Sequence, residues 1–252
     1  MKDMAESIAN EEKRIIRINP VVDETDCEDC DGNGYIISES DVRICNCRSQ
    51  GQPLKRWRAY LDSVKIVSEK ESRIAQTIDP TVGKIPQILQ AWAANRQCSG
   101  VLLRGPSGSG KTCAAHYIAK RIMKTHGLRG RFIDCRHLSV EVSRMVTNED
   151  AARYVHNAED WVLDSELVLV IDDIGGEGNR ASTIQRIHDY INERFLQRSW
   201  TIFTSNMNQF ELEAHYGEIV IQRCLAGSRW MFPINLMGEN LRATLGENND
   251  RR

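Results

Sequence analysis

The sequence predicts an α/β protein with a central parallel sheet covered by helices on both faces, preceded by a small cysteine-rich module. Beyond residue 80, short apolar runs alternate with amphipathic stretches of helical period, which is the pattern of parallel strands joined by helices. Before residue 53, four cysteines fall within 21 residues, a density that indicates a metal-binding cluster rather than core packing.

The period of the apolar residues predicts each element in turn. Leu54, Trp57, Leu61 and Val64 recur at three and four residues, which is the spacing of one helical face. We expect further helices at 85–96, 112–125, 139–163 and 183–197. We expect buried strands at 101–104, 131–135, 167–171 and 200–204, and a last strand within 231–236 that Pro233 interrupts.

The composition is that of a folded protein. Of the 252 residues, 41% are hydrophobic and 27% are charged, which excludes a globally disordered chain. The longest aliphatic run covers only 167–171, whereas a membrane span requires roughly 20 apolar residues. The N-terminus lacks the apolar stretch of a signal peptide. We therefore expect a soluble, cytoplasmic protein without membrane contact.

Charge is distributed unevenly along the chain. Residues 1–50 contain 6 Lys/Arg and 12 Asp/Glu, a balance of −6, whereas residues 51–252 contain 27 and 23, a balance of +4. An excess of this size permits contact between the second part and nucleic acid without requiring it.

A glycine-rich motif between an expected strand and an expected helix carries the clearest chemistry. The motif G-x-x-x-x-G-K-T comprises Gly105, Pro106, Ser107, Gly108, Ser109, Gly110, Lys111 and Thr112. Backbone N–H groups of such a loop close around phosphate oxygens at the start of the helix. Lys111 would then neutralise the β- and γ-phosphates of ATP, and the Thr112 hydroxyl would bind Mg²⁺. The alternative is a glycine-rich turn with an incidental lysine.

Two acidic residues follow the most apolar strand. Asp172 and Asp173 come directly after 167–171, and Asp172 lies 61 residues beyond Lys111. A carboxylate at the end of a strand next to a phosphate-binding loop holds the magnesium of a bound nucleotide. We assign that role to Asp172, directly or through water, and expect Asp173 to orient the attacking water.

With these two motifs, the sequence resembles the AAA+ ATPases, and within them the DnaC/IstB-type helicase loaders, over about residues 84–242. The resemblance implies that Asn206, at the end of the next strand, is the polar sensor that positions water near the γ-phosphate. It also implies that Arg223 is the arginine finger offered to ATP on a neighbouring subunit. Taken alone, Asn206 would be a strand-end turn residue and Arg223 a surface charge. The second motif of the family usually ends in Asp-Glu, so the shorter Asp173 implies slow hydrolysis.

The clustered cysteines form a second candidate site. Cys27, Cys30, Cys45 and Cys47 have the spacing C-x2-C-x14-C-x-C, and tetrahedral zinc takes two ligands from each of two such turns. Because all four positions are filled, we expect a structural rather than a catalytic zinc site. Free thiols and an iron–sulfur cluster are the alternatives. Some bacterial and phage helicase loaders have a similar N-terminal module, and the resemblance implies that it contacts the helicase.

Chain length distinguishes branches within AAA+. Only 46 residues follow Asn206, too few for the finger, a last strand and a separate helical lid, so the sequence resembles the lidless branch of loaders and transposition helpers. The expected domains are an acidic zinc-binding module at 1–53, a helical linker at 54–80, the AAA+ ATPase core at 81–246 and a polar tail at 247–252. The linker begins with Lys-Arg-Trp-Arg at 55–58, which could stack on single-stranded DNA, although a solvated basic face is the favoured interpretation.

These features predict an ATP-dependent loader of the replicative DNA helicase with ATP, Mg²⁺ and Zn²⁺ as ligands. Subunits would assemble with ATP between them, contact a hexameric helicase through the zinc module and place it on single-stranded DNA, which the mildly basic core would contact. The main alternative is a transposition helper ATPase on the same core. A P-loop kinase would need a second phosphate-binding arginine cluster, and a non-enzymatic zinc scaffold would not need Lys111, Thr112, Asp172 and Arg223.

Overall fold

The chain divides into two compact units, Met1–Leu54 and Lys55–Arg252. A computed structural model of the protein describes residues 35–37, 42–44, 53–76, 88, 90–92, 98–225 and 230–236. In the first unit, strand β1 (Tyr35–Ile37) pairs with β2 (Val42–Ile44) in antiparallel orientation. The four clustered cysteines lie outside the described residues, so the zinc module stays a prediction.

A five-stranded parallel sheet forms the centre of the second unit. The strands are β3 (Gly100–Arg104), β4 (Arg129–Asp134), β5 (Leu167–Asp172), β6 (Thr201–Ser205) and β7 (Met231–Asn235). Their order in the sheet is β4-β5-β6-β3-β7, and every neighbouring pair is parallel. The predicted α/β fold and each predicted strand are therefore confirmed. Strand β7 tolerates Pro233 because it lies at the edge of the sheet, where one side of the strand makes no backbone hydrogen bonds to a neighbour and the missing N–H of proline is not needed.

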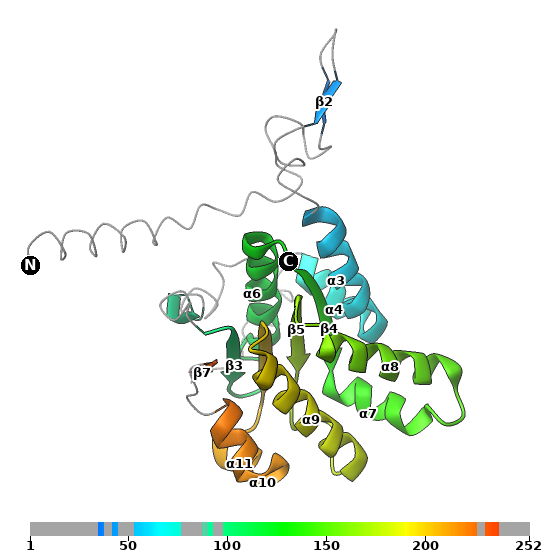
Figure 1. Cartoon of the computed structure of the whole chain (residues 1–252). Helices are drawn as coiled ribbons and strands as arrows, with labels where there is room; N and C mark the ends of the chain where they lie inside the picture. The colour runs from blue at the N-terminus through cyan, green and yellow to red at the C-terminus, as the bar shows by residue number, and fades with distance from the viewer. Residues whose placement is uncertain are drawn as a thin grey trace, which may run out of the picture. The chain divides into compact units, whose positions relative to one another are not determined.

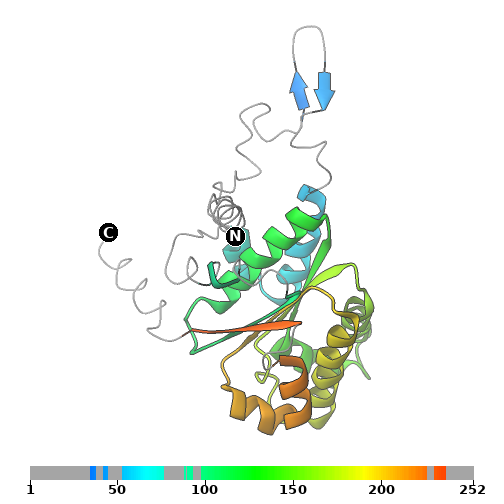
Figure 2. The same cartoon turned by 60° about the vertical axis from the view of Figure 1, so that its left-hand side comes forward.

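Helices cover both faces of this sheet, as predicted. They are α3 (Pro53–Val67), α4 (Glu69–Gln76), α6 (Lys111–His126), α7 (Cys135–Arg144), α8 (Glu149–Leu163), α9 (Ala181–Gln197), α10 (Gln209–Tyr216) and α11 (Glu218–Val220), followed by the π-helix η1 (Ile221–Leu225). Figures 1 and 2 show α6 and α3 on one side of the sheet and α9, α10 and α11 on the other. Of the helix expected at 85–96, the described residues 88 and 90–92 are helical.

The stretch 139–163, expected to be one helix, is two helices. Helix α7 begins earlier than expected because the Asp134 side chain accepts a hydrogen bond from the His137 N–H at 2.7 Å and caps the first turn. Helix α8 begins after Asn148, whose side chain accepts from the Ala151 N–H at 2.9 Å. Two N-terminal caps within 15 residues thus start two separate helices.

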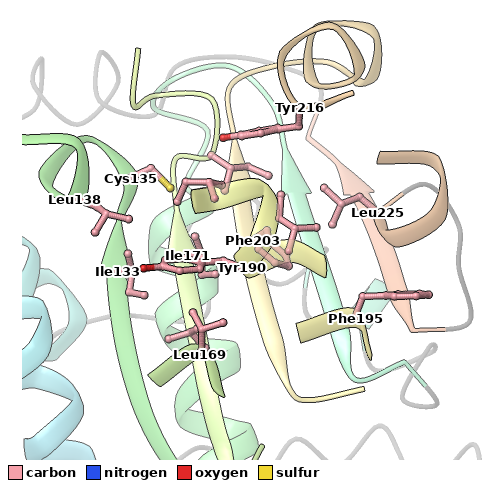
Figure 3. Close-up of a cluster of buried hydrophobic side chains, with 14 of the residues drawn as sticks. Ile133, Cys135, Leu138, Leu169, Ile171, Tyr190, Phe195, Phe203, Tyr216 and Leu225 are labelled. Carbon is pink, nitrogen blue, oxygen red and sulfur yellow. The ribbon is translucent and has the colours of Figure 1, made fainter. Parts of the chain in front are cut away.

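A cluster of buried apolar side chains lies between the sheet and helices α7, α8, α9 and α10 (Figure 3). Leu169, Ile171 and Phe203 from the strands pack with Tyr190 and Phe195 from α9, and all five side chains are buried. Each such side chain contributes about 1.5–3 kcal/mol to folding. This core fixes the ends of β5 and β6, where the candidate site lies.

Helix α3 packs against the sheet. The Ser63 hydroxyl accepts a hydrogen bond from the Phe132 N–H at 3.1 Å, so α3 covers a backbone donor on the edge strand β4. Tyr60 donates or accepts a hydrogen bond at 2.6 Å to Nδ1 of the buried His116. The Trp57 ring is only 6% exposed and stacks on Tyr60, so it is not presented to solvent as a platform for DNA bases. No described helix is long and apolar enough to cross a membrane.

Candidate nucleotide-binding site

The glycine-rich loop connects β3 to α6. Gly108 and Gly110 have φ of 79° and 87°, in the left-handed region where a side chain is disfavoured. A Cβ on Gly105 would lie 2.6 Å from the Leu236 carbonyl oxygen, so the loop passes too close to the end of β7 for a larger residue. The loop therefore directs the N-terminus of α6, with the N–H groups of its first turn, at the space where phosphate would bind.

The Lys111 ammonium is positioned by neutral oxygens. It donates hydrogen bonds of 2.8 Å to the carbonyls of Gly105 and Pro106, and another of 2.8 Å to Oδ1 of Asn206. Lys111 is only 6% exposed. A buried cation gains more from an anionic partner than from neutral acceptors, so this ammonium is suited to binding phosphate.

Asp172 is a buried carboxylate next to the loop. The Thr112 hydroxyl donates to its two oxygens at 3.1 and 3.2 Å, and the Thr204 hydroxyl donates to Oδ1 at 2.6 Å. Burial raises the pKa of Asp172 to about 7, with a smaller contribution from the negative charge of Asp134 in the adjacent strand. Hydrogen bonds from the two threonines act in the opposite direction.

The donor set around Asp172 fits magnesium. Mg²⁺ binds oxygen ligands and in nucleotide sites takes one or two from protein, the rest from phosphates and water. Thr112 and Asp172 supply a hydroxyl and a carboxylate in mutual contact. Among the described residues, Asp172 forms no ion pair, so a divalent cation would also stabilise its charged form.

Asp173 is held by contacts on both oxygens. Asn206 donates to Oδ1 at 2.6 Å, and Arg136 forms an ion pair with Oδ2 at 2.6 Å. The backbone N–H of Asp173 donates to the Thr204 hydroxyl at 2.9 Å. Its φ of 57° lies in the left-handed region, which few non-glycine residues adopt and which the surrounding contacts must therefore stabilise.

The structure thus brings five of the predicted site residues together. Hydrogen bonds and one ion pair run from Lys111 through Asn206 and Asp173 to Arg136, while Thr112 and Asp172 lie beside them. Arg136 was not among the predicted site residues. Arg136 lies two residues after β4, whose last residue pairs with Asp172 at the end of β5. That position could have identified it once the strand order was known.

Two groups of predicted site residues fall outside the part of the chain whose side chains are described. Arg223 lies in η1, but its side chain is outside the described part of the chain. Among the described residues, no cluster of three or more His, Cys, Asp or Glu could hold a metal ion, and Cys27, Cys30, Cys45 and Cys47 fall outside that set. Cys98 and Cys135 are buried and Cys113 is half-buried, as expected of small apolar residues.

Comparison with known proteins identifies the family. The family model of IstB-like ATP binding proteins matches residues 42–226, which include the glycine-rich loop, both aspartates and Asn206. A search of curated protein sequences gives no match.

Several solved structures resemble this one in part. DnaI is 18% identical, with a TM-score of 0.48, and the match covers 76% of this chain and 94% of DnaI. The DnaC helicase loader is 21% identical, with a TM-score of 0.46 and coverage of 73% and 99%. AMPPCP-bound DnaA from Aquifex aeolicus is 14% identical, with a TM-score of 0.45 and coverage of 70% and 53%. At these identities and scores, the likenesses carry no functional argument.

The family match covers most of the chain and includes the residues that form the phosphate-binding loop and the carboxylate pair. It agrees with the parallel sheet and with the contacts among Lys111, Thr112 and Asp172. The chain therefore belongs to the family of IstB-like ATP-binding proteins.

Proposed function

We propose that this ATPase loads a replicative hexameric DNA helicase onto single-stranded DNA, with ATP binding as the assembly signal and hydrolysis as the release signal. The observation that carries the ATP switch is the continuous set of contacts from Lys111 to Asp173 at the carboxyl edge of the sheet. The loader role is supported by the sequence resemblance and by the acidic cysteine-rich segment that precedes the core.

Each residue at this edge has one task in the proposal. Lys111 exchanges its carbonyl and amide partners for the β- and γ-phosphates of ATP. Thr112 and Asp172 hold Mg²⁺, which when bound neutralises phosphate charge. Asp173 accepts a hydrogen bond from the water that attacks the γ-phosphorus, and Asn206 orients that water.

The contacts of Asp173 also provide a physical reason for slow turnover. Arg136 and Asn206 each bond one of its carboxylate oxygens, so they occupy part of the acceptor capacity of the carboxylate and water must compete with them for the remainder. Binding of the helicase or of DNA is the proposed event that shifts this balance. Arg223 of one subunit completes the site on the next by stabilising charge on the transferring phosphoryl group.

The N-terminal unit has the role of partner recognition in this proposal. Cys27, Cys30, Cys45 and Cys47 bind one structural zinc, and the hairpin of β1 and β2 lies between the two cysteine pairs in sequence. A four-thiolate zinc site adds negative charge to a segment that is already acidic. This unit therefore suits a protein surface, and the mildly basic core suits DNA.

A transposition helper is the second candidate. It is favoured by the family match, because the matching model is named after IstB. The two candidates share the ATP site and differ in partner. Affinity purification of the full-length protein with a non-hydrolysable ATP analogue distinguishes them: a hexameric helicase in the eluate supports the loader, and a transposase supports the helper.

The ATP site itself is tested by two substitutions. Lys111→Ala should weaken ATP binding by about 100-fold because it removes the phosphate-binding charge, while Asp173→Asn should bind ATP within about twofold of wild type and lose about 100-fold in turnover. Lys120→Ala, on the same helix but away from the loop, is the matched control and should change neither. Normal ATP binding by Lys111→Ala, measured by isothermal titration calorimetry, would contradict the assignment.

A further inference from the structure

A buried carboxylate lies four residues after Asp173 and belongs to none of the predicted motifs. The Glu177 side chain is 0% exposed. Its oxygens contact Nε2 of His215 at 2.9 Å and the Tyr216 hydroxyl, which donates a short hydrogen bond. Oε2 also accepts from the Gly175 N–H at 2.9 Å. Placing a carboxylate in the interior is costly unless it is fully paired, so this arrangement needs a reason.

Glu177 and Tyr216 together fix the turn that carries Asp173. The Gly175 N–H donates to the Tyr216 hydroxyl at 2.7 Å as well as to Glu177, and the Gly176 N–H donates to the Asp173 carbonyl at 2.8 Å. Figure 3 shows the Tyr216 ring in the apolar cluster, with its hydroxyl turned toward the loop that follows β5. Because Asp173 has a left-handed backbone, its conformation depends on these surrounding contacts.

The same network fixes the start of the segment that carries Arg223. His215 and Tyr216 are the last residues of α10, and they are followed by Gly217 with φ of 96°, then by α11 and η1. The Ile221 N–H donates to the Gly217 carbonyl at 3.3 Å, which connects the end of α10 to η1. Glu177 therefore contacts the loop of the water-orienting aspartate and the helix end that leads into the finger segment.

We infer that Glu177 is a positioning residue that couples Asp173 to the Arg223 segment of the same subunit. Asp173 acts on the subunit's own ATP, and Arg223 acts on the ATP of a neighbour. Glu177 therefore holds both residues of one subunit in the positions that their two ATP sites require. This inference rests on the proposed function, because it takes the two residues to serve two different ATP sites.

The matched substitutions are Glu177→Gln, which preserves shape and removes the charge, and Tyr216→Phe, which removes only the hydroxyl. Tyr154→Phe is the control for the second: Tyr154 is also buried, but its hydroxyl has no hydrogen-bond partner among the described residues. We expect Glu177→Gln and Tyr216→Phe to bind ATP within about twofold of wild type and to lose about 10- to 100-fold in turnover, as a misplaced group does. Tyr154→Phe should retain turnover.

Mixed assemblies separate coupling from an effect on Asp173 alone. Asp173→Asn mixed with Arg223→Ala should regain turnover, because one subunit supplies Asp173 and the other supplies Arg223. Glu177→Gln mixed with Arg223→Ala should not, because the Glu177→Gln subunit misplaces its own Arg223. Recovery equal to that of the first mixture would overturn the coupling. Failure of the first mixture alone would instead contradict the shared ATP site of the proposed function.

Hydrogen–deuterium exchange on the full-length protein tests the coupling without relying on an ATP site shared between subunits. In Glu177→Gln, amide exchange should rise in 174–178 and also in 217–225, with the exchange of α6 unchanged. A rise confined to 174–178, or wild-type turnover by both Glu177→Gln and Tyr216→Phe, would overturn the inference. A rise across the whole sheet would also overturn it, since Glu177 would then act on global stability.

Discussion

Arg194 allows a stability prediction to be worked from individual contacts. This side chain of α9 is 0% exposed. Its five hydrogen bonds run from Nε to the Thr201 hydroxyl (2.9 Å), from Nη1 to the carbonyls of Val162 (3.3 Å) and Asp164 (2.8 Å), and from Nη2 to the carbonyls of Leu167 (2.6 Å) and Trp200 (2.8 Å). Arg194 thus joins the end of α8 to the starts of β5 and β6.

The expected loss follows from these bonds. Burial lowers the pKa of Arg194 to about 10, so the guanidinium is charged at neutral pH. At about 1 kcal/mol net for each hydrogen bond, Arg194→Met forfeits about 5 kcal/mol, and relief of the buried charge offsets about 2 kcal/mol. The free energy of unfolding should therefore fall by about 3 kcal/mol, and Arg194→Lys should lose less because it retains the charge and up to three donors.

Urea unfolding monitored by tryptophan fluorescence measures these differences. Arg153→Met is the matched control, because Arg153 is an exposed residue of α8 whose ion pair with Asp150 is also exposed, and such pairs contribute under about 1 kcal/mol. If Arg194→Met were no less stable than Arg153→Met, the buried guanidinium would not hold these elements together, and the hydrogen-bond reasoning would be refuted.

Two further predictions concern α3 and its partners. Burial lowers the pKa of His116 to about 3, so this histidine binds a proton in the unfolded chain at a higher pH than in the folded protein. Below about pH 6.5, the free energy of unfolding of wild type should therefore fall by about 1.4 kcal/mol per pH unit relative to that of His116→Gln. Parallel pH profiles of the two proteins in urea unfolding would contradict this. A fragment of residues 81–252 should melt at a much lower temperature than a fragment of residues 53–252, or aggregate, because it lacks the buried Tyr60 and Val64. Burial of each of these side chains contributes about 2 kcal/mol. If both fragments were monomers in size-exclusion chromatography and had equal melting temperatures, α3 would have no packing role.

Much of the sheet and part of the site could be predicted because their signals are local. A buried parallel strand is a short apolar run, and the residues after 101–104 and 167–171 must lie at one edge when the strands are parallel. The glycine-rich motif specifies its own turn, since positive φ at Gly108 and Gly110 requires glycine. These features depend on neighbours in sequence and not on the rest of the fold.

The features that the sequence did not reveal depend on contacts between distant residues. Arg136 meets Asp173 only because β4 and β5 are adjacent in the sheet, and nothing in the sequence orders the strands. Glu177 looks like an ordinary polar loop residue until α10 brings Tyr216 to it. The break near Asn148 was missed for another reason, because a capping asparagine inside an apolar period has a weaker signal than the period itself.

Helicase loading onto circular single-stranded DNA tests the central claim most directly. The measurement is unwinding of an annealed oligonucleotide by the co-purifying helicase, with full-length wild type or Lys111→Ala at one ATP concentration. Because unwinding itself consumes ATP, the comparison between the two proteins decides: wild type should stimulate unwinding and Lys111→Ala should not, since its affinity for ATP is about 100-fold lower. Equal stimulation by Lys111→Ala, or none by wild type, would contradict an ATP-dependent loader.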